Sequence, residues 1–94
     1  MKVVWSRRAQ RDLRELASTI AEDSIQGAEL VSERILKAAK SLARTPRGGR
    51  IGRVSGTRER VVARTAYILA YRIKSGQVRI LRVYHGAQKW PSQF

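Results

Sequence analysis

His85 is the only histidine of the chain, and it ends an apolar run in which arginines alternate with aliphatic residues. An imidazole titrates close to neutral pH, so this side chain is suited to proton transfer. Arginine offers a permanent charge and a planar fork of donors that matches phosphate, and four lie in the same region: Arg64, Arg72, Arg79 and Arg82. These residues could form a phosphate-handling site. The simpler interpretation, which we prefer, gives His85 a structural or binding role.

The overall charge narrows the class of partner. The 94 residues include 20 Lys and Arg against 7 Asp and Glu, which gives a formal net charge of +13. Such a field attracts polyanions, namely nucleic acid, a ribosome, an acidic protein or anionic lipid. The absence of cysteine excludes disulfide scaffolds and thiol catalysis, and we expect no metal site and no cofactor. No long apolar segment follows the basic N-terminus, so we expect a cytoplasmic protein without a membrane span.

The first half of the chain predicts the elements that support this region. Lys2 to Trp5 is a β-branched and aromatic run typical of a strand, and Ser6 after it is a good helix N-cap. The helix that follows ends near Asp23, and Ser24 begins a second one. Apolar residues recur at steps of three and four in both: Ala9, Leu13, Leu16 and Ile20, then Ala28, Val31, Ile35, Ala38 and Leu42. We expect a helical hairpin that packs on a sheet.

A basic loop is expected between the helices and the remaining strands. Thr45 to Thr57 contains one proline and four glycines, so regular structure should lapse there. Three arginines are interspersed: Arg47, Arg50 and Arg53. They could clamp a phosphate or an acidic side chain, or they could simply be solvated. No Walker-type sequence supports a nucleotide phosphate cradle.

Three strands should follow the loop, because the hydrophobic period changes to two. They run from Arg58 to Thr65, Tyr67 to Lys74 and Gln77 to His85, and Ser75-Gly76 is typical of a two-residue hairpin turn. A turn of that length places Arg72, Arg79 and His85 together on an open face of the sheet. It also places Arg82 opposite Leu69, on the apolar face. Arg82 must then lie at the sheet margin, bond to a tyrosine, or show that this register is wrong.

The order and spacing of these segments resemble the RelE/ParE superfamily of bacterial toxins, the toxic halves of type II toxin-antitoxin modules. The resemblance rests on five stretches: Trp5 to Leu16, the Pro46 to Arg50 loop, Gly56-Thr57-Arg58-Glu59, Tyr67 to Ile73, and Val78 to Pro91. It implies one α+β domain over residues 1–94, of order β-α-α-β-β-β, with the helical hairpin on one face of a small antiparallel sheet. It also implies a cognate antitoxin, for which the charge suggests an acidic segment that wraps the toxin.

The superfamily divides by target. RelE-like members are ribosome-dependent ribonucleases that need basic residues around the phosphate, whereas ParE-like members inhibit DNA gyrase and need no nuclease site. Where the RelE pattern has an arginine after the tyrosine of the third strand, this chain has Ile68. Further cations of that pattern align with Glu59, Val61 and Gln88. The resemblance therefore favours a ParE-like gyrase inhibitor of the kind that stabilises plasmids.

Two alternatives remain open. The first is a ribosome-dependent mRNA endoribonuclease with His85 as the proton-transfer group, Arg72 and Arg79 as phosphate ligands, and Arg64 and Arg82 as further cations. The second is a plain nucleic-acid-binding module. If the chain acts by binding, the target contacts are expected among Arg60, Arg64, Arg72, Arg79, His85, Lys89, Trp90 and Phe94. The bulky tail residues either reach the target or fold back on the sheet as a lid.

Overall fold

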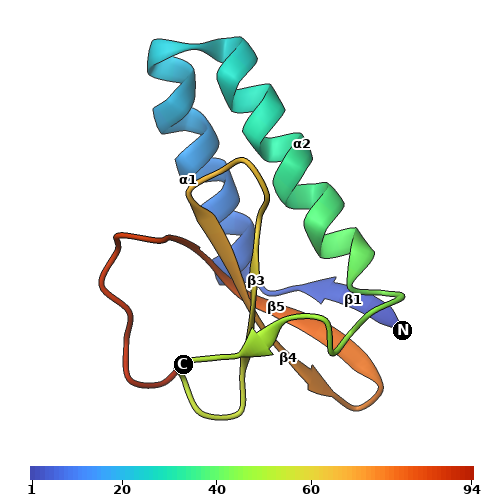
Figure 1. Ribbon diagram of the computed structural model, residues 1–94. Helices are drawn as coiled ribbons and strands as arrows, with labels where there is room; N and C mark the ends of the chain where they lie inside the picture. The colour runs from blue at the N-terminus through green and yellow to red at the C-terminus, as the bar shows by residue number, and fades with distance from the viewer.

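The fold is a helical hairpin laid across one face of a twisted sheet (Figure 1). A computed structural model describes every residue from Met1 to Phe94. Its elements are β1 (Lys2–Trp5), α1 (Arg7–Asp23), α2 (Ile25–Ser41), β2 (Arg50–Ile51), β3 (Arg58–Val61), β4 (Tyr67–Lys74) and β5 (Gln77–His85). The expected α+β class and element order are confirmed, with one short strand added.

The sheet has five strands in the order β1-β5-β4-β3-β2. Four of them are antiparallel neighbours, but β1 pairs in parallel with β5, so the sheet is mixed where we expected an antiparallel one. The addition is β2, a two-residue strand inside the basic loop, which pairs with β3. The strand expected to reach Thr65 ends at Val61. The N-terminal strand thus lies beside the last one, although they are far apart in the sequence.

Both helices begin where the sequence predicted. The Ser6 hydroxyl accepts the backbone N–H of Ala9, and the Ser24 hydroxyl accepts that of Gly27. Their apolar stripes meet the sheet in a core that combines helix and strand residues, the largest being Ile35, Leu42, Leu69, Tyr71 and Ile80. Figure 1 shows the hairpin tip projecting beyond the sheet. No helix is long and apolar enough to cross a membrane.

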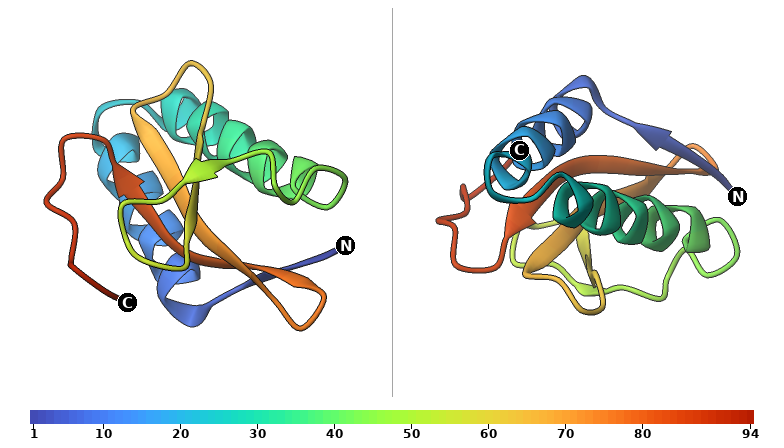
Figure 2. Two further views of the ribbon diagram at one scale, coloured as in Figure 1. Left: turned by 60° about the horizontal axis from the view of Figure 1, so that its bottom comes forward. Right: turned by 90° about the horizontal axis from the view of Figure 1, so that it is seen from above.

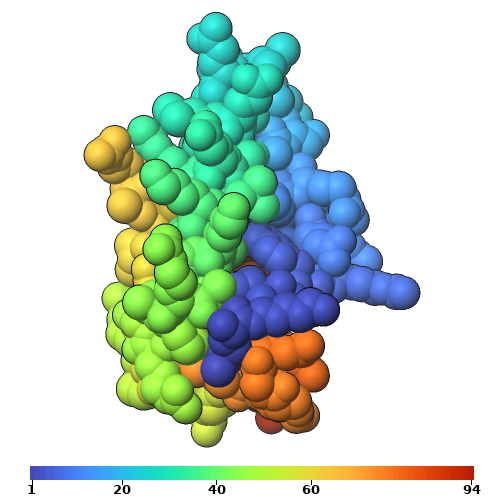
Figure 3. Space-filling model, turned by 90° about the vertical axis from the view of Figure 1, so that its right-hand side faces the viewer, coloured from blue at the N-terminus to red at the C-terminus, as the bar shows by residue number.

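The N-terminus closes one side of the molecule. The terminal ammonium donates to the Ala43 carbonyl at 2.8 Å, just past the end of α2. Figure 3 shows this first segment lying between the end of α2 and the β4–β5 hairpin. The contact fixes the start of β1 against the helical layer.

A bulge between β4 and β5 corrects the expected register. Pairing is as predicted from Lys74↔Gln77 to Tyr71↔Ile80, but it shifts by one residue beyond that point. Arg82 therefore lies opposite Ala70, not Leu69, and His85 opposite Tyr67, not Ala66. Because a one-residue slip exchanges the two faces, His85 moves to the face covered by the helices, away from the expected open surface. Arg82 and Tyr84 move to the other face, which we call the tail side because the C-terminal tail packs there.

Candidate functional site

Two arginines of the basic loop bind the carboxylate of Glu59, a residue of this same chain. The carboxylate of Glu59 on β3 is 2% exposed and accepts from the Arg50 guanidinium at 2.9 Å and from the Arg53 guanidinium at 3.2 Å. The backbone N–H of Arg53 donates to the same carboxylate at 2.7 Å. The sequence predicted that these arginines could clamp an acidic group, and the acid proves to be internal. Arg47, the third arginine, is exposed, and its carbonyl accepts from Arg58.

Tyr71 fixes the path of this loop. Its hydroxyl is enclosed and donates to the Pro46 carbonyl at 2.8 Å, while the backbone N–H of Gly49 donates back to it at 2.9 Å. A Cβ on Gly49 would lie 2.6 Å from the Tyr71 hydroxyl, so only glycine fits this close approach. A buried residue of the core strand thereby sets where the Arg50 and Arg53 cluster begins.

Glu59 should make stability depend on acid pH. Burial alone raises its pKa, but the backbone N–H of Arg53 and the Arg50 and Arg53 guanidiniums outweigh burial and hold the pKa below its usual value of 4.5. A lowered folded-state pKa gives stability that is complete above the unfolded-state pKa and is lost as pH falls through the folded-state pKa. The free-energy advantage of wild type over Glu59→Gln, measured by urea unfolding, should therefore shrink below about pH 4.5. A constant difference down to pH 2 would contradict this account.

A second buried carboxylate explains Arg82. Asp12 on α1 accepts from Arg82 Nε at 2.7 Å and Nη2 at 3.1 Å, and from the backbone N–H of Val83 at 2.9 Å. β1 pairs with β5 only as far as Ile80, so Asp12 covers the edge of β5 that β1 leaves open. The hydrogen bond to Asp12 further raises the pKa of Arg82, which stays charged at every usable pH.

Arg82 also orients Tyr84. Arg82 Nη1 donates to the Tyr84 hydroxyl at 2.9 Å. Two of the explanations offered for Arg82 therefore hold together: it bonds to a tyrosine, and the expected register was wrong. Burial raises the pKa of Tyr84 and outweighs the nearby Arg82, which keeps the phenol neutral. Tyr84 is 1% exposed, and Trp90 and Phe94 of the tail stack on its ring. The lid interpretation of Trp90 agrees with this packing.

His85 makes local contacts only. Its Nδ1 accepts the backbone N–H of Ala87 at 3.1 Å, its ring meets the edge of Tyr67, and its backbone N–H donates to the Gln88 side chain. These bonds shape the turn that ends β5. The imidazole is exposed at a pocket whose lining also includes Asp12, Tyr67 and, of the candidate arginines, Arg82.

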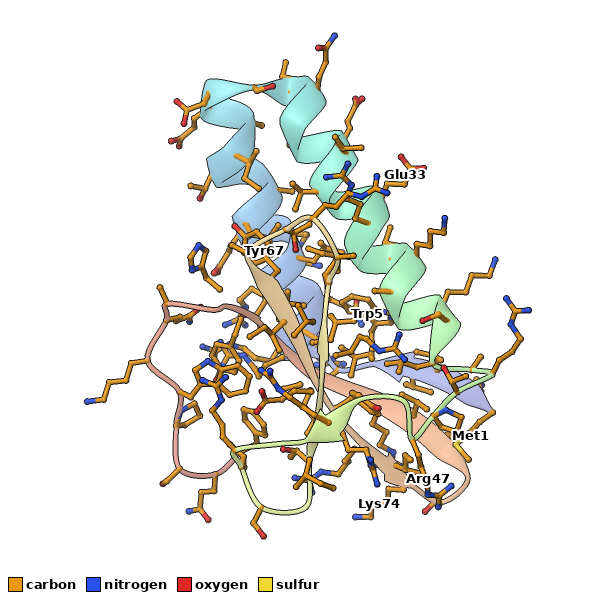
Figure 4. The ribbon with its side chains drawn as sticks, viewed as in Figure 1. Met1, Trp5, Glu33, Arg47, Tyr67 and Lys74 are labelled. Atoms are coloured by element: carbon orange, nitrogen blue, oxygen red, sulfur yellow. The ribbon has the colours of Figure 1, made fainter.

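The candidate ribonuclease residues are not gathered at one place. Arg72 pairs with Arg79 near the β4–β5 turn, whereas His85 lies opposite Tyr67 at the other end of the sheet. Figure 4 shows Tyr67 and Lys74 at these opposite ends of β4. His85 lies six positions after Arg79 on β5, which corresponds to about 20 Å of extended strand. No single phosphate group can contact both ends.

The comparisons with known proteins give the family. The profile described as the ParE toxin of the type II toxin-antitoxin system parDE matches residues 3–90. The chain belongs to the ParE toxin family. Protein Y4kP of Sinorhizobium fredii is 43% identical over 90 residues, which cover 96% of this chain and 93% of that one. Toxin RelE2 of Caulobacter vibrioides is 33% identical over 87 residues, 93% of this chain and 97% of the other.

Solved structures agree with a ParE-family fold. The chromosomal ParDE toxin-antitoxin system from P. aeruginosa matches with a TM-score of 0.82 at 25% identity, over 90% of this chain and 95% of that one. The toxin-antitoxin complex RelBE2 from Mycobacterium tuberculosis matches with a TM-score of 0.62 at 31% identity, over 89% and 95%. The sequence-based assignment to the RelE/ParE superfamily is confirmed.

The other predicted contact residues of this ParE-family toxin occupy three surfaces. Arg60 and Arg64 line a groove between α2 and β3, where the Arg64 carbonyl accepts from Arg34. Arg72 and Arg79 are half-buried on the tail side, and the tail itself carries exposed Lys89 and Phe94. No group of three or more His, Cys, Asp or Glu side chains is placed to hold a metal ion.

Sequence reasoning missed two residues that organise the site, Asp12 and Glu59. Asp12 was overlooked because it lies among charged residues of α1 that do not belong to the apolar stripe. An arginine within an apolar strand was nevertheless a signal that a buried acid must exist. Glu59 was noted only as a missing nuclease cation. Its partners could not be found from spacing, because β2 was not expected to pair with β3.

Proposed function

We propose that this type II toxin inhibits bacterial DNA gyrase by binding and does not cleave RNA. The observation that carries the proposal is the separation of His85 from Arg72 and Arg79. Transition-state stabilisation in a ribonuclease needs donors within about 3 Å of the reacting phosphate, and groups at opposite ends of a sheet do not meet that requirement. A binding surface needs no such convergence.

The bonding partners of Arg82 and Arg64 support the same conclusion. Arg82 is bound to a buried carboxylate, so it would have to abandon Asp12 to reach a phosphate. Arg64 lies in the β3–β4 turn with a positive φ of 61°, and its carbonyl accepts from Arg34 on α2. Arg72 and Arg79 thus lie at the opposite end of the sheet from His85, while Arg82, which lines the same pocket as His85, is bound to Asp12.

An antitoxin is the second proposed partner. Two matched structures are, by their own descriptions, a toxin-antitoxin system and a toxin-antitoxin complex. The net charge of +13 favours an acidic binding segment in that partner. The groove between α2 and β3 suits such a segment, because four cations surround exposed Leu30 and Val61: Arg34, Lys37, Arg60 and Arg64. The cytoplasm, where gyrase and antitoxin are found, is the proposed location.

The proposal predicts a specific biochemical result. Purified toxin at saturating concentration should reduce the supercoiling activity of gyrase at least tenfold, and addition of the antitoxin should restore it. The same preparation should leave translated mRNA intact in a cell-free extract. In cells, induction should raise the DNA damage response while translation continues.

Unchanged supercoiling together with codon-positioned cuts in the message would overturn the proposal and establish the ribonuclease alternative. A His85→Ala variant tests the two candidate functions separately. If the toxin inhibits gyrase, this variant should retain the inhibition through its other contacts. If the toxin cleaves RNA with His85 as general acid or base, the cleavage rate of the variant should fall about a hundredfold or more.

A further inference from the structure

The last six residues of the chain are held to the sheet by side chains alone. Backbone hydrogen bonds tie the preceding turn, from Gly86 to the Ala66 carbonyl and from Gln88 to the His85 carbonyl. No hydrogen bond involves any residue from Lys89 to Phe94. Figure 2 shows this tail leaving the end of β5 as a curved segment without helix or strand. A segment without backbone bonds can detach without disturbing the sheet.

Aromatic and cationic contacts hold the tail in place. The Trp90 ring stacks on Tyr84 with centroids 4.4 Å apart, and the Arg53 guanidinium lies 3.8 Å from the Trp90 centroid. Phe94 adds a more distant contact with Tyr84, at 6.1 Å. Trp90 therefore lies between the Arg53 guanidinium and the Tyr84 ring, a site that we call the aromatic slot.

The walls of the aromatic slot are fixed by the folded domain and do not depend on the tail. Tyr84 receives a hydrogen bond from Arg82, which is itself held by Asp12 from α1. Arg53 is held by Glu59 from β3. Because these side chains are held in place by the folded domain, the slot keeps its shape when the tail leaves. Another aromatic group can then bind without a loss of side-chain entropy in the slot.

The fit of Trp90 is incomplete. Its indole Nε1–H is shielded from solvent and has no acceptor, although a buried tryptophan N–H usually finds one. An unpaired buried donor weakens the docked state relative to a group that satisfies it. The tail is therefore an occupant that a better-matched group can displace.

The charges of the slot decide which class of ligand fits. Arg53 in the slot and Arg82 against Tyr84 are each already bound to a carboxylate, so the slot offers flat faces and little free positive charge. A phosphate needs uncommitted cations, whereas a planar aromatic side chain needs only the faces of Tyr84 and the Arg53 guanidinium. The observations thus favour a protein partner over a nucleic acid.

We propose that Lys89–Phe94 is a detachable lid, and that the aromatic slot beneath it binds an aromatic side chain of a protein partner once the lid lifts. The same movement frees the ring faces of Trp90 and Phe94 that pack on Tyr84 to contact a partner. The docked lid and the partner-bound slot exclude one another. The inference does not depend on whether gyrase is the target, because it concerns an intramolecular contact.

The test supplies the tail in trans. A fluorescently labelled peptide with the sequence of residues 87–94 is titrated, by polarisation, into wild type and into the full-length double variant Trp90→Ala/Phe94→Ala. The peptide should bind the double variant at least tenfold more tightly than wild type, with one peptide per chain. Adding Tyr84→Leu to the double variant, or replacing tryptophan in the peptide by alanine, should abolish this binding.

Matched controls make the result decisive. The exposed change Gln93→Ala should bind the peptide as weakly as wild type does, and Trp90→Leu replaces the double variant if the latter loses its fold by circular dichroism. Equal affinity of the peptide for the lid-released variant and wild type would overturn the proposal. So would absence of binding at millimolar peptide, or tighter binding of a short single-stranded oligonucleotide than of the peptide to the released slot.

Discussion

Asp12→Ala is expected to lower the free energy of unfolding by about 3 to 5 kcal/mol, the range seen when one partner of a buried ion pair is removed. Arg82 is only 16% exposed and would be left without its carboxylate, and the buried N–H of Val83 would lose its acceptor. Domains of this kind are stable by about 5 to 15 kcal/mol, so the change removes a large share of the total. Urea unfolding followed by circular dichroism measures it.

Two companion variants separate the buried pair from general effects of charge. Glu22→Ala removes an exposed acid from the same helix and should change stability by less than about 0.5 kcal/mol. Asp12→Ala/Arg82→Leu leaves no buried charge without a partner, so it should be more stable than the single variant. A loss below about 1 kcal/mol for Asp12→Ala would mean that the pair is worth no more than a surface ion pair.

Local signals predicted the elements well. Serine hydroxyls that cap helices act within three residues, so Ser6 and Ser24 could be recognised from the sequence, and both cap as expected. The Ser75-Gly76 turn fixed the first four pairs of the β4–β5 hairpin. Steps of three and four likewise identified the stripes that face the sheet. Each of these features depends on neighbours along the chain.

The bulge is the feature that the sequence could not reveal. It inserts one extra residue between Ile80 and Arg82, and no glycine or proline marks the place. Its consequence is large, because it exchanges the faces of Arg82, Tyr84 and His85. The apolar pattern did carry one sign of the error, which was an arginine on an otherwise apolar face.

Tertiary contacts decided what the candidate site became. The basic loop was predicted to clamp an anion, but only the pairing of β2 with β3 brings Glu59 between its arginines. The possible catalytic site of His85 with Arg72 and Arg79 required all three to lie on one open face of the sheet. The bulge places His85 on the opposite face. Residues that seemed available for phosphate are thus partly committed to holding the fold.

Gly49→Ala is expected to destabilise the protein by about 3 kcal/mol, the upper part of the range for forcing atoms into a packed site. The added Cβ would lie 2.6 Å from the Tyr71 hydroxyl and 2.7 Å from the Glu59 carbonyl oxygen. Neither can yield easily, since Tyr71 is fully buried and the second contact is backbone. The change should also break the hydrogen bond from the Gly49 N–H to Tyr71.

The matched control for this prediction is Gly86→Ala, whose Cβ would meet its nearest neighbours at the ordinary distances of 3.5 and 3.9 Å. It should be neutral or slightly stabilising, because alanine restricts the unfolded chain. If the loop depends on Tyr71 as the structure indicates, Gly49→Ala should also displace Arg53 from Trp90. The tail peptide should then bind Gly49→Ala in the Trp90→Ala/Phe94→Ala background more weakly than it binds the double variant alone. Equal stability of the two alanine variants would show that the loop adjusts at Gly49, and that Tyr71 does not set the position of the arginine cluster.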